Sequence, residues 1–370
     1  NDGAWTGHLA GPEAPSKPLR ELLDWCRSQD IPTVFWSTVP VADEAAFVRT
    51  ARLFDHVCTV DGDRIADYQA ELGHSRVSWL PFAAQPKLHN PMRHGPGRVH
   101  DVAFAGTAQA GAGDQGGLDQ LRQPALKFGL HLYPDAPYPQ LLAAYASYKA
   151  FVVANPGSGS KTFCPREVFE LAAAQAAVLA TPAPGITELF GDDVEIVHSA
   201  EEAGPALAAL TEQDDYRDRL ALRAHRRVFD DHLLQHRVAA VLTATGLPAP
   251  EPDAIAPDPA ISVVVPTNRP QHLDHVFGTI GRQSHRQVQL VLVQHGFAEP
   301  AAELAARAAA AGVTELVALT APDSATLGRC LNLGVGAADG DFLAKLDDDN
   351  FYGRHYLRDL VRAFSYTDAA

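Results

Sequence analysis

The sequence predicts an α/β protein with parallel sheets, arranged in more than one domain. Short apolar segments typical of buried strands alternate with amphipathic segments typical of helices, and this alternation favours parallel βα units. The length of 370 residues exceeds that of one average domain. A proline-rich stretch at 246–260 separates two regions of this kind and is expected to be an extended linker.

Two predicted units precede the linker. Residues 1–90 are expected to form a partial Rossmann-like unit, with helices at 18–29, 45–51 and 61–72 and strands at 31–36, 54–60 and 77–82. Residues 98–245 form a fuller unit, with strands at 100–107, 129–133, 150–155, 177–181 and 194–197 and helices at 138–148, 165–176 and across 200–245.

The region after the linker, 261–370, is expected to be a nucleotide-binding type of half-sheet. Three predicted strands, 261–265, 288–294 and 314–319, alternate with helices at 270–282, 300–312 and 325–338. A fourth strand then ends in an acidic cluster, and a last helix covers 353–364. This order is a βαβαβαβ run.

Composition limits the possible partners and the compartment. A net charge of −15 argues against a general nucleic-acid or anionic-membrane binder. No apolar run reaches the roughly 18 residues of a membrane span, and no signal-peptide pattern is visible. The four cysteines form no CxxC pair, which fits a reducing, cytoplasmic location. The chain begins at Asn1 rather than Met, so it is expected to be a fragment.

The acidic cluster Asp347, Asp348 and Asp349 is the strongest candidate site. Ligands bind at the carboxyl ends of strands in open α/β sheets. Carboxylates there can share one hard cation, and that cation can bridge a diphosphate. The pattern therefore predicts Mg²⁺ or Mn²⁺ with a nucleotide-sugar. The alternative is an acidic turn that caps the next helix.

Further polar residues of the last region are candidates for the nucleotide side of that site. Pro266, Thr267 and Asn268 end the first strand, and Asn332 lies in the helix before the acidic cluster. Thr267 and Asn268 could instead cap the helix that Pro270 begins. Asn332 could instead lie on a polar helix face.

The second region offers a weaker anion site. Gly106 directly follows a strand, where the backbone must approach another group closely. A Gly/Ser loop at 156–162 opens a helix and presents free amides to an anion. It lacks the phosphate-loop spacing, because Ser160 separates Gly159 from Lys161, and a P-loop ATPase is not expected on that ground.

Arg166 and Glu170 lie one turn apart on the helix after this loop. Arg166 could neutralise a diphosphate, and Glu170 could accept hydrogen bonds from ribose hydroxyls. The alternative is an i,i+4 ion pair on a solvated face.

Other catalytic patterns are missing. The sequence holds no HExxH and no GxSxG motif. His225, His232 and His236 are predicted to be surface residues of one basic helix. Asp61 follows a strand and is predicted to cap a helix rather than to act as a base.

The last region resembles the donor half of the family 2 glycosyltransferases, which have the GT-A fold. The resemblance rests on four pieces: 262–270, Leu331-Asn332 with Gly334, 340–342 and 346–349. It implies that Asp347 and Asp349 are the metal-and-donor carboxylates. Two pieces depart from the family pattern, Gln294-His295-Gly296 and Cys330-Leu331-Asn332. The resemblance also implies that the general base lies beyond Ala370.

Residues 20–245 resemble GT-B-like glycosyltransferases of the spore-maturation type. The pieces that carry this resemblance are 31–36, 54–57, 80–86, 101–107 and 166–171. It implies that Glu170 binds donor ribose. The second glutamate of the usual E-x7-E pattern would fall at Thr162 and is absent.

The sequence therefore predicts a fragment of a larger glycosyltransferase, bifunctional if both modules act, with GT-B-like Rossmann domains followed by a truncated GT-A half-sheet. The parent would move a sugar from a nucleotide-diphosphate donor to a saccharide or glycoconjugate acceptor. The alternatives are a non-catalytic nucleotide-binding scaffold and a nucleotidyltransferase. The donor sugar, the acceptor, the stereochemical outcome and the oligomeric state are left open.

Overall fold

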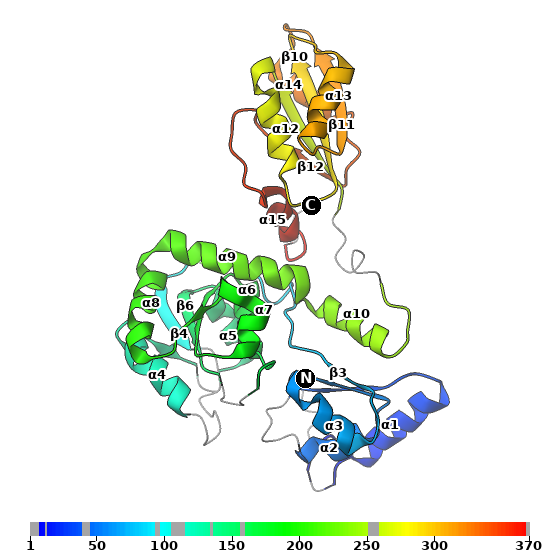
Figure 1. Cartoon of the computed structure of the whole chain (residues 1–370), viewed down its shortest axis with the longest axis vertical. Helices are drawn as coiled ribbons and strands as arrows, with labels where there is room; N and C mark the ends of the chain where they lie inside the picture. Colours follow the sequence, from blue (N-terminus) through cyan, green and yellow to red (C-terminus); the bar gives the residue numbers. More distant parts are fainter. Residues whose placement is uncertain are drawn as a thin grey trace. The chain divides into compact units, whose positions relative to one another are not determined.

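The structure, a computed structural model, describes residues 7–11, 13–38, 45–92, 97–104, 115–133, 136–155, 160–250 and 259–367. The chain divides into two compact units, Asn1–Ile255 and Ala256–Ala370 (Figure 1). Both hold mixed α/β structure in which every paired strand is parallel, as predicted. In the described ranges, no helix combines the length and apolar character that crossing a membrane requires.

The first sheet of unit 1 has the strand order β1-β2-β3. The strands are β1 (Val34–Ser37), β2 (His56–Thr59) and β3 (Val77–Trp79), with helices α1 (Lys17–Ser28), α2 (Ala45–Ala51) and α3 (Ile65–Leu72). Phe35, Val57 and Tyr68 form part of their shared core. The short turn η2 (Gly62–Arg64) precedes α3, and the Asp61 carboxylate accepts from the backbone N–H of Asp63 at 3.1 Å. The predicted cap is confirmed.

The second sheet of unit 1 has the order β5-β4-β6-β7-β8. Its strands are β4 (His100–Phe104), β5 (His131–Leu132), β6 (Tyr148–Val153), β7 (Ala177–Ala180) and β8 (Glu195–Ile196). The helices are α4 (Gln115–Leu126), α5 (Tyr138–Tyr145), α6 (Arg166–Ala173), α7 (Pro184–Phe190), α8 (Ala200–Glu212), α9 (Asp214–Asp231) and α10 (Leu234–Ala244). Consecutive strands β5 and β6 flank β4 on opposite sides, so the topological switch point lies between β4 and β6.

The start of α10 is bonded to the segment that follows β3. Ala84 N–H donates to the His232 carbonyl at 2.9 Å, and Leu234 N–H donates to the Ala84 carbonyl at 2.9 Å. Arg237 Nε donates to the Pro81 carbonyl at 2.7 Å. These bonds join the C-terminal helices of unit 1 to its N-terminal part.

The prediction that three histidines lie on the surface of one helix is wrong, because two of them are buried and His236 lies in α10. His225 is 3% exposed in α9, and His232 is 8% exposed where α9 ends. His225 Nδ1 lies 2.8 Å from the Ala173 carbonyl, and His232 Nδ1 accepts from Arg237 at 2.9 Å. A positive charge on either ring would be cut off from water, which is unfavourable. Both rings are therefore core residues that satisfy their nitrogens by hydrogen bonds.

His232 makes the folding stability of unit 1 sensitive to acid. Burial, followed by the positive charges of Arg237 and His236, lowers the pKa of His232 to about 4. The unfolded chain binds this proton near pH 6.5, so folding stability falls by roughly 3 kcal/mol as the pH drops from 6.5 to 4. We expect urea unfolding to show a smaller loss over this range for His232→Gln. His198→Gln, at an exposed histidine, is the control; equal losses in wild type and His232→Gln would contradict the assignment.

Unit 2 is one four-stranded sheet with the order β11-β10-β9-β12. Its strands are β9 (Ile261–Thr267), β10 (Val288–His295), β11 (Glu315–Ala321) and β12 (Phe342–Lys345). Its helices are α12 (Leu273–Gly281), α13 (Ala301–Ala310), α14 (Leu327–Val335) and α15 (Tyr356–Ala363). The strand order places the switch point between β9 and β12.

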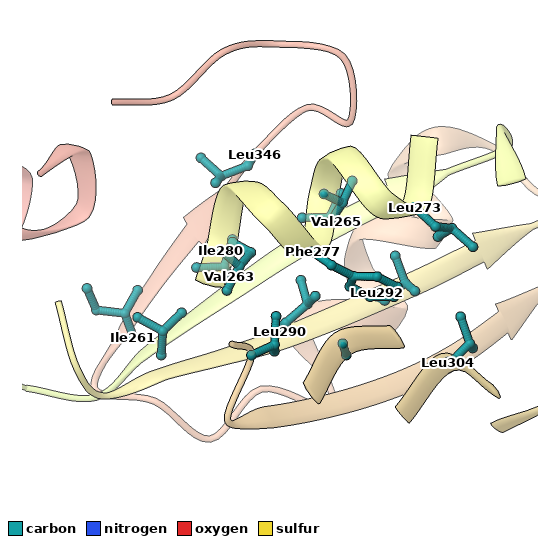
Figure 2. Close-up of a cluster of buried hydrophobic side chains, with 14 of the residues drawn as sticks. Ile261, Val263, Val265, Leu273, Phe277, Ile280, Leu290, Leu292, Leu304 and Leu346 are labelled. Atoms are coloured by element: carbon teal, nitrogen blue, oxygen red, sulfur yellow. The ribbon is translucent and has the colours of Figure 1, made fainter. Parts of the chain in front are cut away.

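Alternate residues of β9 and β10 point to opposite faces of this sheet. Figure 2 shows Val263, Val265 and Leu290 on the face covered by α12, where Phe277 packs against them. Helix α14 covers the other face, where Val293 and Cys330 are fully buried. Both faces of β9 are therefore covered, which fits its continuous apolar sequence.

Candidate functional site

The acidic cluster lies at the switch point of unit 2. Strand β12 pairs with β9 from Phe342↔Ile261 to Lys345↔Val264, so both strands run to the same edge of the sheet. Asp347, Asp348 and Asp349 follow β12 there, and Thr267 ends β9 beside them. Thr267 Oγ1 donates to the Asp348 carboxylate, which joins the two strand ends directly.

Asp348 is the buried centre of this cluster, at 4% exposure. Both of its oxygens are held by Arg269, whose Nε donates to Oδ2 at 3.0 Å and whose Nη2 donates to Oδ1. His272 Nδ1 lies 3.8 Å from Oδ2. These charge-assisted hydrogen bonds fix the position of the Arg269 side chain. Arg269 was not singled out from the sequence, although it directly follows Thr267 and Asn268.

Asp347 and Asp349 are the accessible carboxylates of the cluster. Their side chains are 44% and 47% exposed. Lys345 pairs with Asp347, and Arg269 Nη1 donates to Asp349 at 3.0 Å. Within the described ranges, no three His, Cys, Asp or Glu side chains gather as a protein-only metal site would require.

Two capping alternatives for these residues are wrong. Helix α15 begins at Tyr356 with His355 as its N-cap residue, and no side chain caps it, so the aspartates do not cap the helix that follows them. The helical turn at Pro270 has no side-chain cap either. Thr267 instead accepts from the Arg269 N–H at 3.0 Å, which shapes the strand end.

The remaining candidates of unit 2 lie near the surface. Asn268 is exposed and Pro266 half-buried, both at the end of β9. Asn332 is exposed on α14, which agrees with the polar-face alternative for this residue.

The second candidate location follows β6, at the switch point of the second sheet. Gly106, which follows β4, lies outside the described residues. Ser160 Oγ donates to Asp61 Oδ1 at 2.6 Å, and Thr162 Oγ1 donates to the same oxygen at 3.0 Å. Position 162, where a glutamate is absent, thus lies against a carboxylate from the first sheet. These contacts hold the loop that leads into α6.

Arg166 and Glu170 lie together on α6, but not on a solvated face. The Glu170 side chain is only 3% exposed, whereas Arg166 is 48% exposed. Arg166 Nε lies 3.4 Å from Glu170 Oε1. Burial opposes the charge on Arg166, but Glu170 and then Glu167 outweigh it and raise the pKa of Arg166. The solvated-pair alternative is therefore wrong, and the guanidinium stays charged beside a buried carboxylate.

Three residues around Glu170 were missed from the sequence. Tyr138 and Tyr145 donate to its two oxygens at 2.9 and 2.8 Å, and His89 Nε2 lies 3.7 Å from Oε1. The tyrosines come from α5, one on each end of that helix. Their spacing of seven residues, which places both on one helix face, was the available signal.

The middle of the chain matches a known family. Residues 88–243 match the model of a glycosyl transferase-like family. The match agrees with the expected enzyme class, a glycosyltransferase, for this part of the chain, and the matched range includes Gly106, Arg166 and Glu170. No curated protein sequence matches the chain.

Three solved structures are similar at low identity. TarS from S. aureus is 19% identical, with 28% of this chain and 19% of TarS covered and a TM-score of 0.25. Sucrose-phosphate synthase from Thermosynechococcus elongatus is 12% identical, with 60% and 69% covered and a TM-score of 0.38. Anabaena HepE, in complex with UDP and glucose, is 12% identical, with 62% and 76% covered and a TM-score of 0.45. The chain thus spans 19% of the length of TarS.

Proposed function

We propose that this chain binds a nucleotide-diphosphate sugar and is part of an enzyme that transfers the sugar to a saccharide or glycoconjugate acceptor. The observation that carries the proposal is the place of Asp347, Asp348 and Asp349 at the switch point between β9 and β12. In open α/β sheets this crevice is where nucleotides bind. The glycosyl transferase-like match of residues 88–243 supports the same chemistry for unit 1.

The exposed carboxylates of unit 2 fit a divalent metal ion that is bound partly by substrate phosphates. Mg²⁺ is commonly held by one or two carboxylates together with substrate phosphates rather than by a cage of protein ligands. Asp347 and Asp349, each nearly half exposed, supply two carboxylates of that kind. Such an ion, Mg²⁺ or Mn²⁺, would neutralise charge on the leaving diphosphate. Lys345 can turn to the diphosphate oxygens, and so can Nη1 of Arg269, which bonds the exposed Asp349, while Nε and Nη2 of Arg269 stay on Asp348.

The protein side of the donor site follows from the strand ends. We assign Pro266, Thr267 and Asn268 to the nucleotide side, with Asn332 at its margin. Asp348 holds Arg269 in place and stays bound to it. Unit 2 is then the donor half of a GT-A-type fold within residues 261–370, after the linker at 246–260.

Unit 1 supplies a second donor site of GT-B type. Residues 1–90 and 98–245 are its two Rossmann-like domains, and Gly106, Arg166 and Glu170 lie on the donor side. Arg166 is the exposed cation at the start of α6 and would receive the diphosphate.

The four cysteines are unpaired, which supports a cytoplasmic location.

A nucleotide-sugar binding screen with and without Mn²⁺ tests the proposal. Wild type should bind at least one nucleotide-sugar, with a Mn²⁺-dependent part that is lost in Asp349→Ala and a Mn²⁺-independent part that is lost in Arg166→Gln. Binding without turnover of any common donor would favour the scaffold. Release of pyrophosphate rather than a nucleoside diphosphate would identify a nucleotidyltransferase. Failure of every common donor to bind would contradict the proposal.

A further inference from the structure

A buried carboxylate from the first sheet of unit 1 holds the segment that leads into α6. Asp61 follows β2 and is 4% exposed. Its Oδ1 accepts from Ser160 Oγ at 2.6 Å and from Thr162 Oγ1 at 3.0 Å, two hydroxyls that lie 99 and 101 residues further along the chain. Ser160 is itself 7% exposed. Hydrogen bonds to a carboxylate that is shielded from water are stronger than those between neutral groups at the surface.

Backbone groups join the same two segments. The Lys161 N–H donates to Asp63 Oδ2 at 2.8 Å, and the Asp63 N–H donates to Thr162 Oγ1 at 3.1 Å. A Cβ added at Gly62 would lie 3.2 Å from Thr162 Oγ1 and 3.3 Å from Cγ of Trp79. The turn after β2 therefore lies directly against the segment before α6, with almost no room for a side chain at position 62.

The segment before α6 also has a fixed local shape. Ser160 Oγ accepts from the N–H groups of Thr162 at 3.1 Å and Phe163 at 3.0 Å. A Cβ added at Gly185, in α7, would lie 2.3 Å from the Phe163 carbonyl oxygen, so α7 packs closely against the segment as well. Arg166 begins α6 shortly after Phe163. The place of this segment therefore determines where Arg166 and the first helical turn lie.

We infer that Asp61 is a positioning residue, which holds the start of α6 in the place where a diphosphate binds. This inference rests on the donor site proposed for unit 1. That site needs the exposed guanidinium of Arg166 and the N–H groups of the first helical turn to face the same ligand. The segment before this turn is neither helix nor strand, so side-chain hydrogen bonds rather than a backbone ladder keep it in place. Without the Asp61 carboxylate, the segment occupies the ligand-binding position for only part of the time.

Substitutions of Asp61 should change the affinity of unit 1 for inorganic pyrophosphate. If the segment keeps its position about a tenth of the time in Asp61→Ala, the apparent affinity falls about tenfold. Asp61→Asn keeps an oxygen acceptor for the two hydroxyls and should retain most of the affinity. Thr162→Val removes one of the two hydroxyl donors at nearly the same volume and should give a smaller loss than Asp61→Ala. Asp67→Ala is the matched control, because Asp67 is an acid of α3 whose side chain is 54% exposed, and it should bind as the wild type does.

Two measurements on the full chain test this inference. Calorimetric titration with pyrophosphate is done in EDTA on an Asp349→Ala background, so that a metal-dependent site in unit 2 does not contribute. Amide hydrogen exchange then follows the N–H groups of Lys161, Thr162 and Phe163, which are hydrogen-bonded in the structure. These groups should lose protection in Asp61→Ala, and saturating pyrophosphate should restore it, because a ligand shifts the equilibrium toward the state that binds it. A role in stability alone would not produce this local, ligand-dependent protection.

Arg166→Gln separates the failure of this inference from the failure of the proposed function. If Arg166→Gln leaves pyrophosphate binding unchanged, the proposed donor site of unit 1 is wrong, and the inference that rests on it is wrong as well. If Arg166→Gln removes binding while Asp61→Ala binds as the wild type does, the positioning inference alone is wrong. A loss of protection spread over the whole first sheet would also overturn it. If Asp61→Ala does not fold, Thr162→Val decides, with the same expected signs in both measurements.

Discussion

Replacing Asp349 with asparagine should abolish the stabilisation of this chain by Mn²⁺ and a nucleoside diphosphate. A ligand that binds only the folded state at a hundred times its Kd stabilises by about 2.7 kcal/mol. For a domain of this size that corresponds to a rise in Tm of several degrees. The Asp349 side chain is accessible and, among the described residues, accepts a hydrogen bond from Arg269 Nη1, so the substitution removes the ligand site and leaves the buried pair of Arg269 and Asp348 intact.

Thermal unfolding with Mn²⁺ alone, UDP alone and both together measures this effect. Asp339→Asn is the matched control, because Asp339 is an exposed acid before the opposite end of β12. It should keep the full shift in Tm. An undiminished shift in Asp349→Asn would mean that the metal and nucleotide bind elsewhere.

Two glycines of α12 should respond to alanine in opposite directions. An added Cβ at Gly281 would lie 1.8 Å from the Ala311 carbonyl oxygen, a backbone atom that cannot turn aside. The ends of α12 and α13 would have to separate, and overpacking of this kind costs up to about 3 kcal/mol. At Gly278 the nearest atom is a flexible Arg282 nitrogen at 3.8 Å, an ordinary contact. There alanine should stabilise the helix by up to about 1 kcal/mol.

Urea unfolding of the full chain, followed by a signal from unit 2, measures both variants. Gly278→Ala is the internal control, because it makes the same chemical change in the same helix. A similar stability for the two variants would show that the close approach of α12 and α13 is relaxed in solution.

The order of strands and helices was predictable because each carries its own periodicity. The fully buried strands β9 and β10 are apolar runs, and α12 and α13 show one apolar face. Helix starts were less predictable. The helix expected from 353 begins at Tyr356, since residues 351–353 form an irregular segment held by Gln283, which donates to the Gly353 carbonyl at 3.0 Å.

Two pieces of the sequence resemblance in unit 2 have a packing role. A Cβ at Gly334 would meet Val264 at 2.4 Å, and a Cβ at Gly340 would meet the Ser262 nitrogen at 2.6 Å. These glycines let α14 and the start of β12 approach β9. The other pieces, at Thr267 and at Asp347 to Asp349, meet at the strand ends and carry the candidate chemistry.

What the sequence could not show is how charges pair over long separations. Arg269 binds Asp348 across 79 residues, and Tyr138 binds Glu170 across 32. Such pairs depend on which strands become neighbours, and no local pattern encodes that. The buried state of His232 was missed for the same reason, because its partner ring Phe190 comes from α7.

The central claim is that a nucleotide-diphosphate sugar binds at the carboxyl ends of β9 and β12. A crystal structure of the chain with Mn²⁺ and UDP, with anomalous scattering to locate the metal, tests it most directly. The account predicts one manganese peak bound by the diphosphate and the carboxylates of Asp347 and Asp349, with Arg269 still paired to Asp348. Ordered UDP with manganese at any other place in unit 2, or no nucleotide at this edge under saturating conditions, would contradict it.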